Sequence, residues 1–114
     1  MPLIRDGKLR AYGVTTSYRI KVLPDVPAIG EVIKGYDAIG WYGVGVPAKT
    51  SPEIIKKLSD AVNAAITVPA VKEKFTTLGV EPMPLTPDGF KKHIATEVAK
   101  WAKVIETQGI QAIN

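Results

Sequence analysis

The run from Gly40 to Glu53, GWYGVGVPAKTSPE, constrains the fold of this chain more than any other stretch. Its first half combines valines with aromatic side chains, which suits a packed, pleated strand. After a loop that contains a proline, Thr50 or Ser51 can cap a helix and Pro52 fits its first turn. Glu53 lies three residues after Thr50, as a capping box requires. The run therefore predicts a strand-to-helix unit of an α/β domain.

Repeating patterns of apolar side chains predict further elements on both sides of this run. Alternation with β-branched side chains is typical of strands, and a spacing of three and four residues is typical of helices. Strands are expected over Lys8–Thr16 and Tyr36–Val46. Helical segments are expected over Ala28–Ile33, Pro52–Thr67, Pro69–Leu78 and, after the cap Thr86, Pro87–Gln108. Gly109 should stop the last helix, and a short strand or tail is expected over Ile110–Ile113.

Each of the three main helices carries an apolar stripe that is expected to pack inward. In chain order, the stripes are Ile54, Leu58, Ala61, Val62 and Ala65; Val71, Phe75 and Leu78; and Phe90, Ile94, Val98, Trp101 and Ile105. Two strands rarely form a stable sheet alone, and three stripes need a surface to cover. We therefore expect this chain to pair with a copy of itself through an exposed strand edge, or to swap an element with it.

Length and composition are those of an ordinary single domain. With 114 residues, 46% of them apolar, the chain can form one domain with one modest core. The absence of cysteine excludes disulfides, thiolate metal sites and cysteine nucleophiles. The net charge of +4 comes from scattered basic residues without interleaved stacking aromatics, so no nucleic-acid binding is expected.

The start of the chain, Met1–Asp6, has no apolar signal-peptide core, and no apolar run is long enough to span a membrane. A chain made as written is therefore expected to be cytoplasmic.

Residues suited to catalysis are few. His93 is the one histidine, and its spacing places it in the last helix near Phe90 and Glu97. A surface or half-buried helix histidine is favoured over a catalytic one. A single histidine without cysteine also disfavours a zinc site. The carboxylates follow no recognisable motif, so we predict no enzyme activity, no catalytic residue, no metal and no cofactor.

Three glycines, Gly40, Gly43 and Gly45, lie inside the second expected strand. Glycines in a strand mark close backbone approach, a bend or a bulge. A dinucleotide or phosphate loop needs its glycines between a strand and a helix, so this pattern favours a twisted strand.

Four sequence blocks resemble, in order, the C-terminal part of the Bug (TctC-type) extracytoplasmic solute receptors of tripartite tricarboxylate transporters. They are Gly7–Thr16, similar to GKLRALAVTS; Leu23–Glu31, similar to LPDVPTxxE; Gly35–Pro52, similar to GYxxxxWYGxxxPAxTP; and Trp101–Ile110, similar to WxKVIxxxGI. The resemblance covers nearly all of residues 4 to 114. Members of the family are roughly two and a half times longer than this chain.

The resemblance implies an α/β fold, specifically part of the two-lobed periplasmic-binding-protein-like fold. Residues 1–35 would be a remnant of the second lobe, and residues 36–114 would supply a strand and the helices of the first lobe. Strands from the family's N-terminal half would be missing, so the resemblance, too, implies a fold completed by oligomerisation, most simply as a homo-oligomer. The parent receptor would be periplasmic, would bind a small organic acid and would contact the membrane subunits of the transporter.

By the same resemblance, four residues lie near the ligand cleft: Thr15, Thr16, Trp41 and Tyr42. The threonines would donate hydrogen bonds to a carboxylate. Trp41 would pack against the apolar part of a ligand, and the Tyr42 hydroxyl would donate a further hydrogen bond. Alternatively, the threonines are ordinary strand residues and the aromatic side chains belong to the core. Arg19 either pairs with a carboxylate through both sides of its guanidinium or lies on a solvated loop.

The N-terminus of the helix that begins at Pro52 is a second candidate anion site, because its first amides are unpaired. Glu53 already places a carboxylate there, so structural capping is favoured.

Three functional hypotheses remain open at the level of the sequence. The first is a segment of a solute receptor that does not catalyse a reaction, and the second is a self-associating domain of the same ancestry without a ligand site. The third is an enzyme of unrecognised mechanism.

Overall fold

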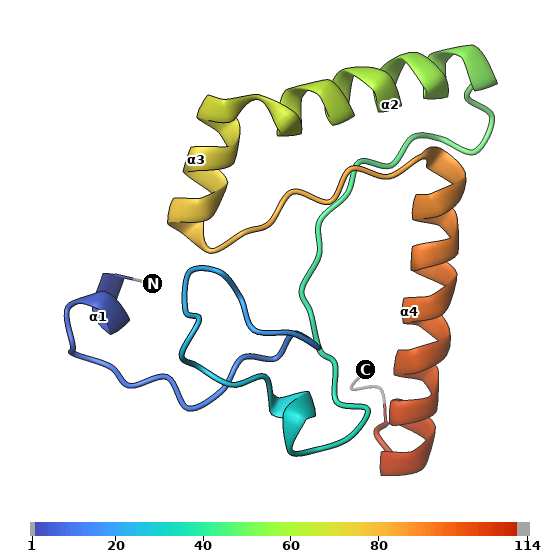
Figure 1. The fold of residues 1–114 in the computed structure, drawn as a ribbon. Coiled ribbons are helices and arrows are strands. Elements are labelled where there is room, and N and C mark those ends of the chain that lie inside the picture. The colour runs from blue at the N-terminus through green and yellow to red at the C-terminus, as the bar shows by residue number, and fades with distance from the viewer. Residues whose placement is uncertain (1, 112–114) are drawn as a thin grey trace. The chain divides into compact units, whose positions relative to one another are not determined.

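The computed structural model describes residues 2–111, which divide into two compact units. The first unit contains residues 2–46 and 69–82, and the second contains residues 47–68 and 83–111. In chain order, the helical elements are α1 (Pro2–Arg5), the 3-10 turn η1 (Ile29–Glu31), α2 (Pro52–Thr67), α3 (Pro69–Leu78) and α4 (Pro87–Gln108) (Figure 1). The three main helices have the bounds that the sequence predicts, and η1 lies within the expected short helix.

Local caps explain where the helices of the second unit begin. The Ser51 hydroxyl accepts a hydrogen bond from the Ile54 amide at 3.4 Å, so Ser51 rather than Thr50 caps α2. The Thr86 hydroxyl accepts one from the Gly89 amide at 3.0 Å and caps α4. These bonds satisfy amides that have no partner in the first helical turn.

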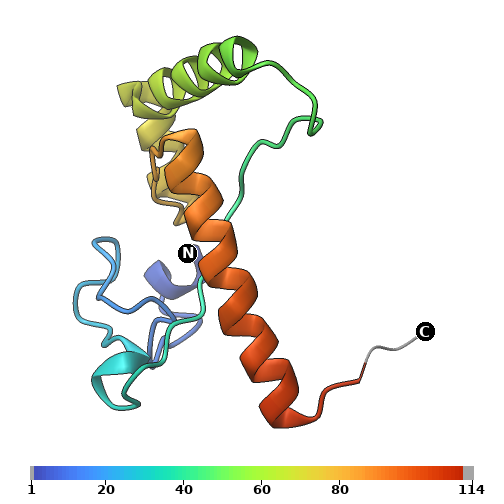
Figure 2. The ribbon, with the colours of Figure 1, turned by 90° about the vertical axis from the view of Figure 1, so that its right-hand side faces the viewer.

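Helix α4 is one continuous helix in the turned view (Figure 2). It ends where Gly109 takes a left-handed conformation, with φ 61°. That conformation costs glycine little because it has no Cβ, so the predicted stop at Gly109 is confirmed.

The prediction that the apolar stripes of α2 and α4 pack inward is largely wrong. In α2 the stripe at Ile54, Leu58, Ala61, Val62 and Ala65 is exposed, whereas the partly covered positions are Ile55, Ser59, Asn63 and Ile66. In α4 only Phe90 of the stripe is partly covered, and the other covered positions are Gly89, His93, Glu97 and Lys100. The stripes stay exposed because the described part of the chain lays no apolar layer over them.

Helix α3, in the first unit, follows its prediction more closely. Val71 and Phe75 are partly covered, as the spacing predicts. Leu78, at the last position of the helix, is 71% exposed, so its inward placement is wrong.

The strands predicted over Lys8–Thr16 and Tyr36–Val46 do not form within the described residues. One isolated parallel bridge joins Val14 to Ala28, with the Val14 amide donating to the Pro27 carbonyl at 2.9 Å. A strand needs a neighbour that pairs with its amides and carbonyls along its length, and a two-stranded ribbon is marginal alone. Within residues 2–111 the structure is therefore helical and does not show the expected α/β character.

Burial in the first unit is concentrated at the bridge. Ala28 is fully buried and is the one buried apolar residue among those that the structure describes. A Cβ added to Gly13 would lie 3.0 Å from the Ile29 side chain, so the backbone packs closely there. At Gly40 and Gly45 an added Cβ would meet nothing within 4 Å, so close backbone approach was the wrong interpretation for these two. Among the described residues, the modest core expected from the chain length is not formed.

Two further predictions concern the end of the chain and its division into lobe segments. Ile110 and Gln111 adopt no regular secondary structure, and the rest of the segment expected over Ile110–Ile113 lies outside the described residues. The division into lobe segments at residues 35 and 36 stays a prediction. Within residues 2–111, no helix combines the length and apolar character needed to cross a membrane.

Replacing the cap residue of α4 by alanine should destabilise the helix. Thr86→Ala removes the acceptor of the Gly89 amide, and loss of such a cap costs about 1 kcal/mol of the free energy of unfolding. Thr96→Ala is the matched control, because the exposed Thr96 hydroxyl bonds only to the Lys92 carbonyl of its own helix. Urea unfolding followed by far-UV circular dichroism should show a loss for Thr86→Ala and no loss for Thr96→Ala. Equal stabilities of the two variants would contradict the cap assignment.

Candidate functional site

Thr15 and Thr16 both lie in the first unit, directly after the bridge residue Val14. The Thr15 carbonyl accepts a hydrogen bond from the Ala38 amide at 2.9 Å, and its side chain is exposed. The Thr16 hydroxyl donates to the Tyr18 carbonyl at 2.5 Å. As a donor to a ligand, Thr16 would first have to give up this local bond, whereas Thr15 would present its hydroxyl at the surface.

Trp41 and Tyr42 lie in the same unit, on the extended segment that begins at Tyr36. Trp41 is 36% exposed and Tyr42 is 94% exposed. The bond from the Ala38 amide to Thr15 joins this segment to the threonines. Trp41 follows Ala38 by three residues, which an extended chain spans in about 10 Å. The fold thus brings together the two segments that carry the candidate residues.

Arg19 forms a bidentate ion pair with Glu31 in the first unit. Its Nε and Nη2 atoms donate to the two carboxylate oxygens of Glu31, each at 2.8 Å. The Ala28 amide also donates to Glu31, at 2.9 Å, so the carboxylate holds both the loop and the start of η1. Of the two alternatives left open by the sequence, Arg19 takes the paired one, and its partner is a carboxylate of this same chain.

This pair shifts the ionisation of both groups. The hydrogen bond from Arg19, followed by the bond from the Ala28 amide, lowers the pKa of Glu31 from its ordinary 4.5 to about 2. The Glu31 carboxylate in turn raises the pKa of Arg19. Both side chains are nearly half exposed, so the pair orders the loop rather than forming a buried charge site.

A second long-range contact ties the same loop to the segment after α3. The Tyr18 hydroxyl donates to the Glu81 carboxylate at 2.9 Å. This hydrogen bond, partial burial and the charges of Glu81 and Asp37 together raise the pKa of Tyr18. The two residues are 63 positions apart, and no local sequence pattern links them.

In the second unit, His93 lies on α4 with its ring stacked on Phe90, the ring centroids being 6.4 Å apart. It is partly covered, which is the half-buried helix histidine that the sequence favours. Four residues further along, Glu97 accepts a hydrogen bond from the Trp101 indole at 3.1 Å and pairs with Lys100 at 2.5 Å.

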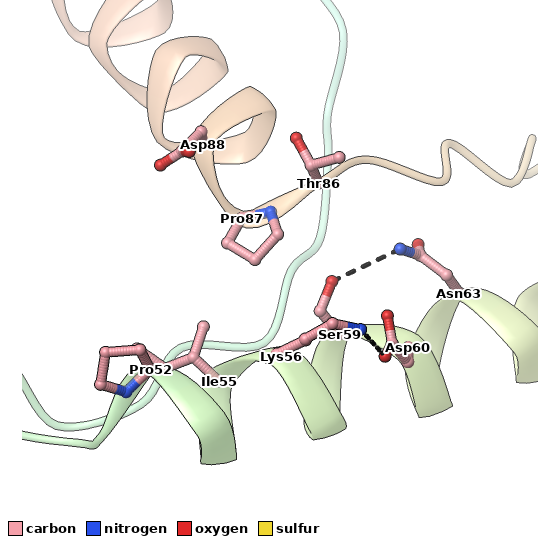
Figure 3. A pocket seen from close by; sticks show the side chains of 9 residues that line it. All are labelled: Pro52, Ile55, Lys56, Ser59, Asp60, Asn63, Thr86, Pro87 and Asp88. Atoms are coloured by element: carbon pink, nitrogen blue, oxygen red, sulfur yellow. Dashed lines mark hydrogen bonds and ion pairs between the residues drawn. The ribbon is translucent and has the colours of Figure 1, made fainter.

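A groove of about 540 Å³ lies between α2 and the first turn of α4 (Figure 3). Nine residues line it: Pro52, Ile55, Lys56, Ser59, Asp60, Asn63, Thr86, Pro87 and Asp88. The Asn63 amide donates to the Leu85 carbonyl at 2.9 Å and so fixes the segment that leads into α4. Sequence reasoning missed this groove because its lining comes from two segments more than twenty positions apart.

The charges of the groove do not suit an anion. Lys56 pairs with Asp60 at 2.6 Å, and Asp88 adds a second carboxylate in the first turn of α4. The positive end of that helix already faces an acidic side chain. At the start of α2, the Ile54 amide is bonded to Ser51, which supports capping rather than an anion site there. The described residues contain no cluster of three or more acidic, histidine or cysteine side chains arranged to hold a metal ion.

Comparison with known proteins places the chain in a family. Residues 1–110 match the family described as the tripartite tricarboxylate transporter family receptor, TctC. The chain belongs to the TctC receptor family. The resemblance seen in the four sequence blocks is therefore confirmed.

Individual relatives agree with this assignment. Protein BugT of Bordetella pertussis is 38% identical over 109 residues, which are 93% of this chain and 33% of BugT. A UPF0065 protein in the TAR-I ttuE-ttuC' intergenic region of Agrobacterium vitis is 37% identical over 110 residues, which are 93% of this chain and 32% of that protein. A UPF0065 protein in the clcB-clcD intergenic region of Pseudomonas knackmussii is 29% identical over 104 residues, with 90% of this chain and 62% of the relative covered. The chain spans about a third of the length of the first two TctC-type relatives.

The Arg19–Glu31 pair predicts a specific pH dependence. Because the pKa of Glu31 is lower in the folded state, the pair's contribution to stability is complete above about pH 4.5 and is lost as the pH falls toward about 2. Carbon-detected NMR titration of the Glu31 carboxyl should give a pKa near 2. Arg19→Gln should move that pKa upward toward its ordinary value. Lys49→Gln, which removes a positive charge elsewhere, should leave it in place, and a Glu31 pKa unmoved by Arg19→Gln would contradict the contact.

Proposed function

We propose that this chain is a segment of a Bug-type solute receptor whose whole protein binds small organic carboxylates. The observation that carries the proposal is the match of residues 1–110 to the TctC receptor family. The whole protein would act in the periplasm and deliver its ligand to the membrane subunits of a tripartite tricarboxylate transporter. The chain covers a third of its first relatives, so this activity belongs to the longer protein.

Within this segment, we place the ligand contacts at Thr15, Thr16, Trp41 and Tyr42. The hydrogen bond between Ala38 and Thr15 keeps the two contributing segments adjacent, which supports a shared site. Tyr42 is 94% exposed and the Thr15 side chain is exposed, so the hydroxyl groups of both can reach a carboxylate from solvent. Trp41, with about a third of its surface exposed, can cover the apolar part of a ligand.

The activity we propose is binding without catalysis. Its support is the family, which consists of receptors, together with the residue inventory of the chain. The single histidine stacks on Phe90 within α4, a placement that suits packing.

A second candidate is a self-associating domain of the same ancestry that lacks a ligand site of its own. The observation that favours it is the exposure of the apolar side chains of α4, including Val98 at 63% and Ile105 at 48%. Exposed apolar patches of this kind mark interaction surfaces or aggregation-prone faces.

A thermal-shift screen of the chain against mono-, di- and tricarboxylates, with aromatic acids included, tests the first proposal. A ligand at one hundred times its dissociation constant adds about 2.7 kcal/mol of stability. For a chain of this size the midpoint of unfolding should rise by roughly 4 to 8 °C.

Variants locate the site. Tyr42→Phe and Thr15→Val should reduce or abolish the shift, because each removes a hydroxyl donor. Tyr12→Phe is the matched control, since Tyr12 is likewise exposed, at 80%, but lies outside the proposed contacts. A shift that survives Tyr42→Phe and Thr15→Val would refute the site, and a folded sample that shifts with no carboxylate would favour the second candidate.

A further inference from the structure

The loop of residues 15–27, in the first unit, carries both candidate threonines and is closed at its base. The Val14 amide donates to the Pro27 carbonyl at 2.9 Å, and the Ile29 amide donates to the Val14 carbonyl at 3.0 Å. These two hydrogen bonds form the parallel bridge between Val14 and Ala28. A compact surface loop whose two ends lie together in this way is an Ω-loop, and loops of this kind are frequently functional.

The Arg19–Glu31 pair ties the inside of this loop to its base. The guanidinium donates to both carboxylate oxygens of Glu31 at 2.8 Å, and its Nη1 donates to the Pro24 carbonyl at 3.5 Å. The same carboxylate accepts a hydrogen bond from the Ala28 amide at 2.9 Å. Ala28 is fully buried and is the bridge partner of Val14. One carboxylate therefore holds the guanidinium at the point where the loop closes.

Thr15 and Thr16 are consequently held from both sides. Val14, which precedes them, is bonded to the base of the loop. Arg19, which follows them, is bonded to Glu31. A short segment fixed at both ends keeps few of the backbone conformations that are open to a free chain.

The order of the loop reaches the other segment of the candidate site through Thr15. The Thr15 carbonyl accepts a hydrogen bond from the Ala38 amide at 2.9 Å, and Trp41 and Tyr42 follow on the same extended segment. A displacement of Thr15 would break this bond and let the two segments separate. The ion pair can therefore act on the site through the backbone.

We propose that Arg19 and Glu31 are positioning residues of the carboxylate site. Their ion pair holds Thr15 and Thr16 beside the segment that carries the aromatic residues, without contacting the ligand. The inference rests on the proposed function, because it takes its site residues from there. Both partners are nearly half exposed, so loss of the pair should loosen this loop and leave the rest of the unit folded.

Amide hydrogen exchange, followed by NMR, tests the positioning without a ligand. Arg19→Gln removes the guanidinium, so the base of the loop should open more often and the Ile29 and Ala38 amides should exchange about tenfold faster. The amides of α3, in the same unit, should keep their rates. Lys56→Gln is the matched control, because it removes the cation of an exposed ion pair in the second unit and should change neither amide.

A double variant shows whether the two residues act as one pair. Glu31→Gln added to Arg19→Gln should speed exchange little further, because the ion pair is already lost and glutamine keeps an acceptor for the Ala28 amide. Effects of the two substitutions that simply add would contradict the pair.

Carboxylate affinity tests the link between the pair and the site. The probes are acetate, succinate, citrate and benzoate, titrated by calorimetry at a temperature at which every variant is folded. If the competent conformation of the loop falls to about a tenth of the population, the dissociation constant rises about tenfold. Arg19→Gln should show this rise for each probe that the unmodified chain binds, and Lys56→Gln should not. A purely structural role would lower the unfolding midpoint and leave the affinity of the folded chain unchanged.

Two results would overturn the inference. One is an Arg19→Gln variant in which the Ile29 and Ala38 amides change no more than the amides of α3. The other is a folded Arg19→Gln variant with unchanged affinity for a probe that the unmodified chain binds. If the unmodified chain binds no probe, the receptor proposal fails for this segment, and the exchange rates still decide whether the pair holds the loop.

Discussion

Hydrogen bonds between residues close together in the chain hold most of this structure. Each main helix forms its backbone bonds within itself, and the caps at Ser51 and Thr86 act over three residues. The extended segments cannot satisfy their backbone groups in this way, because an extended chain needs a second segment to pair with along its length. Within the described residues the structure therefore has helices and one bridge, between Val14 and Ala28. Everything else about its surface follows from this difference.

Side-chain hydrogen bonds and an ion pair hold the segments that lack regular backbone pairing. The Arg19–Glu31 pair closes the loop of the first unit, and Tyr18 joins that loop to Glu81. In the second unit, the Asn63 side chain fixes the chain before α4. These contacts are polar and partly exposed, so each orders its segment at a modest gain in stability. The segments that carry the threonines and the aromatic residues of the candidate site are joined by the hydrogen bond from the Ala38 amide to the Thr15 carbonyl.

The chain belongs to the TctC receptor family and exposes apolar side chains on its helices. The chain spans about a third of the length of its first relatives. An apolar face of this kind can be covered by more sequence or by another copy of the chain. The residues proposed for the ligand site lie in the first unit, whereas the exposed apolar side chains of α4 lie in the second.

The sequence by itself determined the helices, because caps, prolines and the stop at Gly109 act within one turn and need no tertiary partner. It also determined the family, through blocks of residues that keep their order and spacing. The candidate residues could be named from the resemblance, but not the contact between Thr15 and Ala38 that brings their segments together. The tertiary structure decided which helix faces are covered, that Glu31 is the partner of Arg19, and that the strand-like segments form one bridge, between Val14 and Ala28, within the described residues. Those outcomes depend on which segments meet in space, and the spacing of residues along a single element carries no information about its neighbours.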